Sequence, residues 1–309
     1  MTLASGAVAG AFLLDVAVGE PPDRVHPVAW FGRVVGTLDR DWGRPRAVGV
    51  VLALSLPVIA AGLVGIGVGV LGNADWRVGL ATGAVVLFLT TSLRALLTAV
   101  YRVDRLATSD LPDARSELRA LAGREATDLD AAGIRSAALE SLAENLADGL
   151  VAPVTAFATG AVLAGAVGVR SPWVLALACA CAVWLKAVNT MDSMVGYRHR
   201  PLGFGAAKAD DVAMWVPARL TALLLAAWLL APGALGRARE WASDVPSPNS
   251  GWPMGVMAAG LDVRLEKPGE YVLHADGAPP AAGHVRRALG RVALAGLSAY
   301  ALAGVVAWY

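Results

Sequence analysis

The sequence is poor in charged residues, and this scarcity argues against an ordinary soluble domain. Charged residues make up 17% of the 309-residue chain, against about 25% in soluble domains. The formal net charge is only +1, so no global field attracts nucleic acid and we expect no nucleic-acid partner. The 56% of hydrophobic residues gather in blocks, several of which reach the roughly 20 residues that a helix needs to cross a bilayer.

Cysteines are few, and nucleotide-binding glycine loops are missing from the sequence. Cys179 and Cys181 lie inside one apolar block with no histidine nearby, so we expect neither a disulfide nor a metal site there. The sequence contains no Walker or Rossmann glycine loop and no evident internal repeat. A nucleotide, if the protein uses one, has no recognisable motif to bind it.

The apolar blocks predict an all-α fold, a polytopic bundle of membrane helices that forms one domain over residues 1–309. The expected spans are 3–18, 48–71, 78–100, 151–169, 172–188 and 288–308. The apolar stretch 212–231 contains Pro217 and Arg219, and its uninterrupted part is short. We therefore expect a re-entrant or interfacial helix there.

Basic residues predict the orientation of the chain in the membrane. The long loops after the first, third and fifth spans carry most of the arginines, whereas the connections at 72–77 and 170–171 are very short. In membrane proteins the loops on the cytoplasmic side carry an excess of Lys and Arg. We therefore expect helical segment 101–150 and the proline-rich loop segment 232–287 to face the cytoplasm, in a multi-pass protein of the cell membrane.

Three acids recur every four residues just before the fourth span, namely Glu140, Glu144 and Asp148. On a helix they fall within an arc of about 80°, where like charges repel. Such a stripe suits a hard cation, most simply magnesium that carries a phosphate group. A solvated helix face is the structural alternative, which the adjoining membrane span weakens.

Two further polar clusters lie at the ends of spans. Asp15 and His26 flank the end of the first span, where an interfacial turn would explain them equally well. Lys186, Asn189 and Asp192 end the fifth span, although snorkelling to the interface would account for Lys186. The density of amide, hydroxyl and carboxylate groups there exceeds what the end of a span needs.

The last two clusters follow the fifth span. Lys208 precedes Asp210 and Asp211, and Asp210 would also serve as a helix cap. Prolines on both sides of Asn249 predict a stiff turn whose backbone N–H groups suit a phosphate. A plain surface turn is the simpler reading of that stretch taken alone.

In this order the clusters resemble the CobD/CbiB family, the adenosylcobinamide-phosphate synthases of cobalamin biosynthesis. The matching strings are Asp15 with 19–22 and 26–28, 140–149 with 152–153, 186–198, 204–221 in part, and 247–253. They cover nearly the whole chain, and five strings in register are specific. Val245, Leu202 and the pair at 266–267 depart from the family pattern, which puts in doubt an essential role for the family residues at those positions.

The resemblance implies an enzyme that forms an amide bond with ATP as co-substrate and magnesium as cofactor. Its partners would be a corrinoid, adenosylcobyric acid, and aminopropanol or aminopropanol phosphate. A second copy of the chain and other enzymes of cobalamin biosynthesis are left open as protein partners.

For that reaction we assign a role to each polar cluster. The expected catalytic residues are Glu140, Glu144, Asp192 and Asp211, and the expected magnesium ligands are Glu140, Glu144, Asp148, Asp192 and Asp210. The expected substrate- and phosphate-binding residues are Asp15, His26, Asn145, Lys186, Asn189, Arg198, Lys208, Arg219 and Asn249.

Two rival functions stay open at this point. A magnesium-dependent phospho- or prenyl-transferase of the membrane also uses carboxylates four residues apart, but its second acidic string is missing here. A membrane transporter predicts ionisable residues near the middle of the membrane and often an internal repeat.

Overall fold

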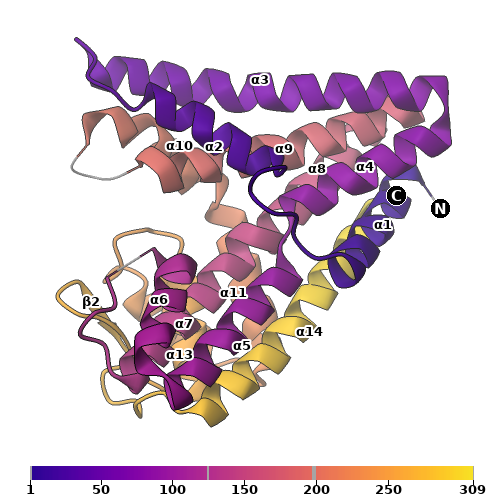
Figure 1. The fold of residues 1–309 in the computed structure, drawn as a ribbon. Coiled ribbons are helices and arrows are strands. Elements are labelled where there is room, and N and C mark those ends of the chain that lie inside the picture. The colour runs from indigo at the N-terminus through magenta and orange to yellow at the C-terminus, as the bar shows by residue number, and fades with distance from the viewer. Residues whose placement is uncertain (1, 124, 197–199, 309) are drawn as a thin grey trace. The chain divides into compact units, whose positions relative to one another are not determined.

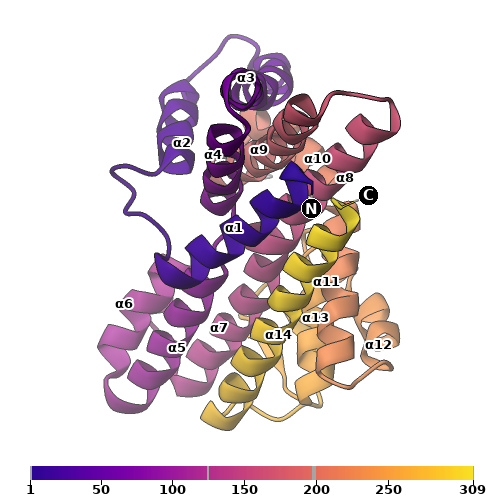
Figure 2. The ribbon, with the colours of Figure 1, turned by 90° about the vertical axis from the view of Figure 1, so that its right-hand side faces the viewer.

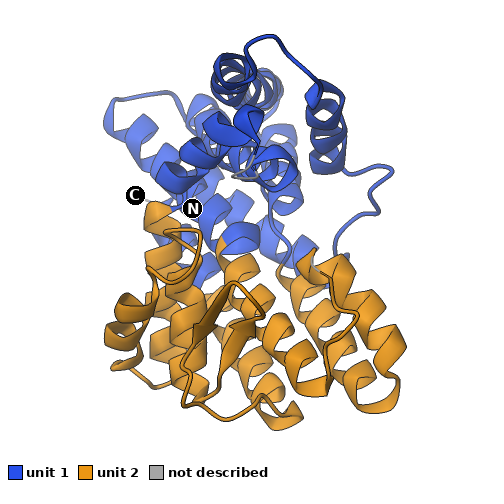
Figure 3. Cartoon of the chain, turned by 90° about the vertical axis from the view of Figure 1, so that its left-hand side faces the viewer, with its two compact units in different colours: residues 1–92, 148–214, 299–309 blue, residues 93–147, 215–298 orange. Residues whose placement is uncertain are grey.

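The structure, a computed structural model, describes residues 2–123, 125–196 and 200–308. Nearly all of its regular secondary structure is helical, which confirms the predicted all-α fold. The chain divides into two compact units, coloured separately in Figure 3. Unit 1 comprises residues 1–92, 148–214 and 299–309, and unit 2 comprises residues 93–147 and 215–298. That the chain forms one membrane domain stays a prediction.

Unit 1 is built around the long apolar helix α3 (Pro45–Ala74). Its other elements are α1 (Leu3–Ala17), α2 (Pro27–Leu38), α4 (Trp76–Thr90), the π-helical turn η1 (Ala147–Val151), α8 (Ala152–Ala166), α9 (Ser171–Val195), the 3-10 turn η2 (Pro201–Gly203), α10 (Phe204–Ala213) and the last turns of α14 (Ala282–Val306). Helix α3 packs against α4, α9 and α10, and α1 packs against α4 (Figures 1 and 2).

A small apolar cluster fixes the helices that carry the polar residues of unit 1. It joins Val35 of α2, Ala53 of α3, Met191 and Val195 of α9, and Ala206 of α10, each at most 5% exposed. Because the cluster includes residues of both α9 and α10, it holds these two helices in a defined register.

Unit 2 contains a helical bundle and a short hairpin. Its elements are α5 (Leu93–Ser109), α6 (Leu111–Ala122), α7 (Ala131–Leu146), α11 (Trp215–Trp228), α12 (Ala234–Trp241), α13 (Gly251–Leu261), β1 (Leu265–Lys267), β2 (Tyr271–Leu273) and most of α14. The strands pair antiparallel, with Leu265 opposite Leu273. Asp104 of α5 and Arg135 of α7 form an ion pair of 2.6 Å with both side chains largely buried.

Five helices in the described part of the chain are long and apolar enough to cross a membrane: Pro45–Ala74, Trp76–Ser109, Ala131–Ala166, Ser171–Val195 and Ala282–Val306. They make the chain a multi-pass membrane protein. A sixth candidate is the pair Pro201–Ala213 and Trp215–Trp228, which breaks at Met214 and overlaps most of the stretch 212–231, where a re-entrant helix is expected. Helix α1 has only 15 residues.

Both segments expected to be soluble contain regular structure, which the sequence predicted as helix for 101–150 but not for 232–287. The expected fourth span, 151–169, is the second half of a helical run that already begins at Ala131 within the segment 101–150. The proline-rich segment 232–287 contains α12, α13 and the hairpin as well as loops. Their side of the membrane stays a prediction.

We predict that Gly49→Ala destabilises the protein, whereas Gly62→Ala does not. A Cβ atom at Gly49 would collide with the carbonyl oxygen of Leu202, so α3 and η2 would have to separate. Overpacking of this kind costs about 1–3 kcal/mol. Gly62 lies in the same helix and nothing lies within 4 Å of its Cβ position, so the better helix propensity of alanine should dominate.

The measurement is the Tm of each purified variant in detergent. A lower Tm for Gly49→Ala and an unchanged or higher Tm for Gly62→Ala is the expected pair of results. Equal shifts in both variants would contradict the close approach of α3 to η2.

Candidate functional site

An amide side chain joins two carboxylates at the centre of unit 1. The Asn189 Nδ2 atom of α9 donates to Asp148 Oδ2 of η1 at 3.1 Å and lies 3.4 Å from Asp210 Oδ1 of α10. Asn189 and Asp210 are buried, at 7% and 9% exposure. Since α9 and α10 are part of apolar helical segments, each of these polar groups needs a partner inside the protein.

The sequence explains why Asp148 lies in a π-helical turn. Pro153 has no N–H, so the carbonyl of Gly149, four residues earlier, loses its usual helical donor. The backbone N–H of Ser92 donates to the Gly149 oxygen instead, at 2.8 Å. A Cβ at Gly149 would lie 2.5 Å from Ser92 Oγ, so glycine permits this approach. Asp148 therefore departs from the regular helical stripe, and π-helical turns of this kind are frequent at functional sites.

More charged groups surround this amide. Lys186 Nζ, one turn before Asn189, lies 3.5 Å from the carbonyl oxygen of Asp148. On α10, Lys208 pairs with Asp211 at 2.8 Å. Asp192 is close enough to Asp148 and Asp211 for mutual repulsion. The structure thus brings together seven of the residues that the sequence singled out.

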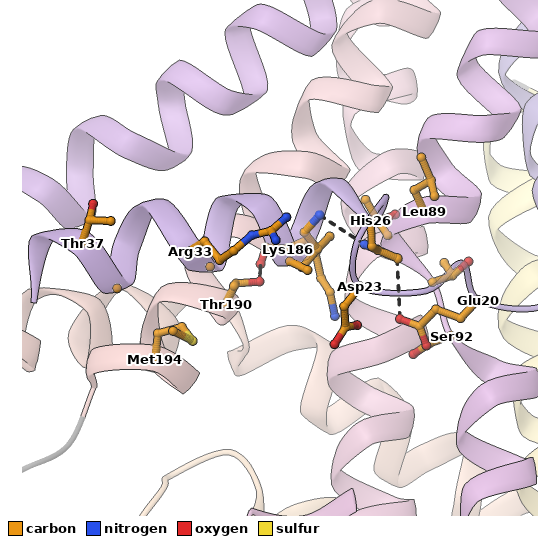
Figure 4. Close-up of a pocket in the computed structure, with 16 residues that line it drawn as sticks. Glu20, Asp23, His26, Arg33, Thr37, Leu89, Ser92, Lys186, Thr190 and Met194 are labelled. Carbon is orange, nitrogen blue, oxygen red and sulfur yellow. Dashed lines mark hydrogen bonds and ion pairs between the residues drawn. The ribbon is translucent and has the colours of Figure 1, made fainter. Parts of the chain in front are cut away.

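A cavity of about 980 Å³ adjoins this cluster and shares Lys186 with it. Ligand sites in proteins typically measure about 300–1,000 Å³. Figure 4 shows Glu20, Asp23, His26 and Ser92 at one end of the cavity and Thr37 and Met194 at the other. Its walls come from the loop before α2, from α2 and α9, and from the end of α4 with the residues that follow.

A smaller, apolar cavity of about 260 Å³ lies next to it. Lys186 and Thr190 of α9 line both cavities, as do Val28, Leu89 and Thr90. The other residues that line the small cavity are apolar side chains of α2, α3, α4 and α9. A ligand with a charged end and an apolar body would find both environments side by side.

His26 occupies the polar end of the large cavity as the N-cap of α2. Its Nδ1 atom accepts a hydrogen bond from the Val28 backbone N–H at 3.2 Å. Its Nε2 atom is buried without a hydrogen-bond partner in the described residues, and the nearest carboxylate oxygen, Glu20 Oε1, lies 3.6 Å away. Burial lowers the pKa of His26 and so does the nearby charge of Lys186, whereas Asp23 opposes them.

Sequence reasoning missed Glu20 as a site residue. It stands in one of the strings that carry the family resemblance, between Gly19 and Pro21, but its motif alone indicates only a turn. In the structure it lines the large cavity, and burial raises the pKa of its carboxyl group above the usual range. What shows that Glu20 belongs to a site is its position in space beside His26, and this position cannot be predicted from the sequence.

Glu140 of unit 2 is held by two side-chain donors. Ser136 Oγ donates to Glu140 Oε1 at 2.9 Å, and the Tyr271 hydroxyl donates to Oε2 at 2.7 Å. Ser136 Oγ also accepts from the backbone N–H of Glu266 at 2.8 Å. This network attaches both strands of the hairpin to α7, so in this structure the Glu140 carboxylate has a structural role.

Arg219 of unit 2 fastens α11 to the turn around Asn249. Its Nη1 atom donates to Asn249 Oδ1 at 2.6 Å, and Nη2 donates to the Pro248 carbonyl at 3.3 Å. The guanidinium also lies over the rings of Trp215 and Trp252, at 4.7 and 5.1 Å from their centroids. Arg219 and Asn249, both expected to bind substrate, are thus brought together and fix the turn.

The remaining expected site residues are more scattered. Asp15 is buried in α1 and is not among the residues that line the large cavity. Glu144 and Asn145 are half-buried in α7, and Asn145 donates to the Ser141 carbonyl at 2.9 Å. Arg198 lies outside the described residues. That the acids of unit 2 join those of unit 1 in one centre stays a prediction.

The oxygen-rich set of unit 1 is chemically suited to magnesium. Asp148, Asp192, Asp210 and Asp211 supply hard oxygen donors, and their mutual repulsion is relieved by a cation. Within the described ranges no group of three or more His, Cys, Asp or Glu side chains is arranged so that it could hold a metal ion by itself. That arrangement still fits magnesium, which is usually held by one or two carboxylates together with phosphates and water.

Fold and site define a class: a polytopic α-helical membrane protein with a polar, ligand-sized cavity between its helices. The family model CobD/Cbib protein matches residues 8–293, and the chain belongs to that family. No solved structure is significantly similar to this chain.

Curated relatives agree with this assignment over most of their length. The chain is 35% identical over 271 residues to the "Probable cobalamin biosynthesis protein CobD" of Methanothermobacter thermautotrophicus, which covers 85% of this chain and 84% of that protein. It is 35% identical over 319 residues to the "Cobalamin biosynthesis protein CobD" of Mycobacterium tuberculosis, which covers 97% of this chain and 95% of that protein. The protein of the same name from Rhodobacter capsulatus is 35% identical to this chain over 273 residues, which cover 84% of this chain and 80% of that protein.

We predict that Tyr271→Phe destabilises the protein by about 1.5–3 kcal/mol, the range for a hydrogen bond to a charged group. The change removes the hydroxyl that donates to the buried Glu140 carboxylate. Tyr101→Phe is the matched control, because Tyr101 is 48% exposed on α5. Thermal unfolding in detergent compares the two, and equal Tm values would contradict the structural role of Glu140.

Proposed function

We propose that this chain acts in cobalamin biosynthesis as an ATP-dependent ligase of the membrane. In the proposed reaction the free carboxylate of adenosylcobyric acid is joined to the amine of aminopropanol or aminopropanol phosphate. The product is adenosylcobinamide or its phosphate. Family membership and the names of the relatives support the pathway, and the chemistry of the site supports the reaction.

One observation carries the proposal: the cluster of Asp148 with the buried Asn189 and Asp210 shares Lys186 with the large cavity. A carboxylate does not react with an amine at neutral pH, so it must first be converted to an acyl phosphate. That conversion needs a phosphate-binding region next to a substrate cavity, with a cation between them. Lys186 has the charge and the position for this role.

Other residues of unit 1 would support the same step. Asp192 and Asp210 would hold magnesium together with the ATP phosphates and water, and Asp148 and Asp211 would add negative charge beside it. The metal would neutralise charge on the ATP phosphates. Asn189 would keep Asp148 and Asp210 at a fixed separation. The apolar cavity beside Lys186 and Thr190 would hold apolar parts of the corrinoid side chain.

The orientation predicted from the basic loops fits this chemistry, because ATP is available on the cytoplasmic side. Lys186 and Asn189 lie in the second half of α9, towards the end at which we expect the chain to enter the cytoplasm. The proposal thus needs no route for ATP across the membrane.

We predict that Asp192→Asn and Asp210→Asn each lower amide formation by about 100-fold or more, the scale expected when a charged group that acts in the transition state is removed. Both changes keep the side-chain size and remove one negative charge from the proposed magnesium site. Glu117→Gln, on the exposed face of α6, is the control for the same kind of change.

The assay combines purified protein, adenosylcobyric acid, aminopropanol phosphate and ATP with magnesium, and mass spectrometry detects the product. Glu144→Gln, tested alongside, shows whether the acid of unit 2 also takes part, in which case the same loss is expected. Near-normal turnover of Asp192→Asn or Asp210→Asn would contradict the assigned magnesium site. Wild-type protein that forms no amide would overturn the proposed reaction.

A further inference from the structure

Only one ring nitrogen of His26, Nδ1, has a hydrogen-bond partner among the described residues, and this partner determines where the proton of the ring lies. Nδ1 accepts the Val28 backbone N–H at 3.2 Å, so Nδ1 carries no proton. In a neutral imidazole the proton is then on Nε2, which makes Nε2–H a hydrogen-bond donor. To act as a base at Nδ1, the ring would have to give up the cap of α2.

The Nε2–H group needs an acceptor. The His26 side chain is 6% exposed, and Nε2 has no hydrogen-bond partner in the part of the chain that the structure describes. A buried donor left unpaired costs about 1–3 kcal/mol. Glu20 Oε1 lies 3.6 Å away, so a shift of less than about 1 Å would complete a hydrogen bond of normal length.

The environment of His26 keeps the ring neutral. Its pKa is lowered, first by burial and then by the charge of Lys186, with Asp23 opposing both. His26 is therefore a fixed, uncharged donor rather than a proton acceptor. It has the properties of a residue that orients the carboxylate of Glu20.

Glu20 has the properties of a proton acceptor for a cationic substrate. Its side chain is 42% exposed and lines the large cavity beside Asp23. Its pKa is raised, first by burial and further by Asp23, while Lys186 opposes the shift. A carboxylate with a raised pKa is a stronger base than an ordinary glutamate. The end of the cavity with these two acids therefore suits an ammonium group.

The surrounding cations do not cancel this preference. Lys186 reaches the cavity from α9, but its Nζ atom also lies beside the Asp148 carbonyl. Arg33 lines the cavity farther along α2, towards Thr37 (Figure 4). Lys186 also attracts Glu20, but Glu20 and Asp23 together carry one charge more than Lys186, so the loop end of the cavity stays net negative and suits the amine.

We propose that Glu20 is the catalytic residue that binds the ammonium group of the amine substrate and takes its proton, and that His26 is the positioning residue that holds Glu20. This inference rests on the proposed ligase function. The amine is protonated at neutral pH and has no lone pair to attack with. Transfer of one proton from R–NH3⁺ to the Glu20 carboxylate gives R–NH2 and a neutral Glu20.

The amine nitrogen then attacks the acyl phosphate carbon, and the C–N bond forms as the C–O bond to phosphate breaks. The second nitrogen proton leaves with the phosphate as HPO4²⁻, so atoms and charge balance. Glu20 returns its proton to the solvent through the open side of the cavity. No redox step and no further co-reactant is needed.

The test separates the use of the amine from the activation of the carboxylate. Hydroxylamine is unprotonated at neutral pH and traps an acyl phosphate as a hydroxamate without a base. For Glu20→Gln we expect kcat/KM for aminopropanol phosphate to fall by about 100-fold or more. Hydroxamate formation from adenosylcobyric acid and ATP with magnesium should stay within about twofold of wild type, since Glu20 plays no part in that step.

His26 is tested with a matched pair of variants. Asparagine can still accept from the Val28 N–H, so His26→Asn keeps the helix cap but lacks the Nε2–H donor. We expect its KM for the amine to rise by about tenfold at a wild-type Tm. His26→Ala loses the cap as well and should also lower the Tm. A fall in Tm for both variants with no change in KM would overturn the positioning role.

The pH dependence gives an independent readout. Because the pKa of Glu20 is raised, Glu20 loses its charge at a higher pH than an ordinary glutamate as the solution is acidified. The acid limb of kcat/KM for the amine should therefore lie above the usual glutamate range and be absent in Glu20→Gln. Loss of the His26 donor removes stabilisation of the charged carboxylate, so His26→Asn should move this limb to still higher pH.

The outcomes distinguish the two proposals. Amide formation by Glu20→Gln at near wild-type kcat/KM would overturn the role of Glu20, as would loss of hydroxamate together with amide in a variant with wild-type Tm. If Glu20→Gln fails to fold, Glu20→Asp replaces it, because aspartate keeps the charge on a shorter side chain. Wild-type kinetics for the amine in Glu20→Asp would show that the position of the carboxylate does not matter, and would overturn the role of His26. Wild-type protein that yields neither amide nor hydroxamate would instead refute the ligase function.

Discussion

Polar groups inside apolar helices must find their partners within the protein, and unit 1 is organised around this constraint. Asn189 meets it with one amide group that faces carboxylates on two other elements. This amide connects α9 to α10 and to the turn η1. Packing of aliphatic side chains alone would leave the carboxylates there without a partner. The arrangement also concentrates acids beside Lys186, a residue that lines the large cavity.

Local sequence allowed the spans and the polar clusters to be predicted, because both depend on neighbouring residues. Apolar runs near α3, α4, α8, α9 and α14 are long enough to be recognised by length alone. The clusters around Asn189 and Asp210 stood out because polar residues are rare next to such runs. That these two meet in space follows from the packing of α9 on α10, which a single sequence does not contain.

Other parts of the site depend on contacts between distant residues or on the backbone conformation, and neither can be predicted from a single sequence. Glu140 matched a metal-binding stripe by spacing, yet its partner Tyr271 is 131 residues away. The π-helical turn at Asp148 results from Pro153 together with a donor at Ser92. Glu20 is recognised as a site residue through the orientation of the His26 ring, and that orientation depends on the hydrogen bond by which His26 caps the start of α2.

The Glu140 network has a consequence for how the end of the chain contributes to the membrane helices. Tyr271 and the backbone N–H of Glu266 are the hairpin's links to α7, which runs on into the span that ends at Ala166. A shortened chain that stopped before β2 would leave the buried Glu140 carboxylate, in the first third of that helical run, without its phenol donor. The C-terminal third is therefore needed for the integrity of a helix made much earlier in synthesis, and that helix reaches its final environment only after the hairpin has emerged.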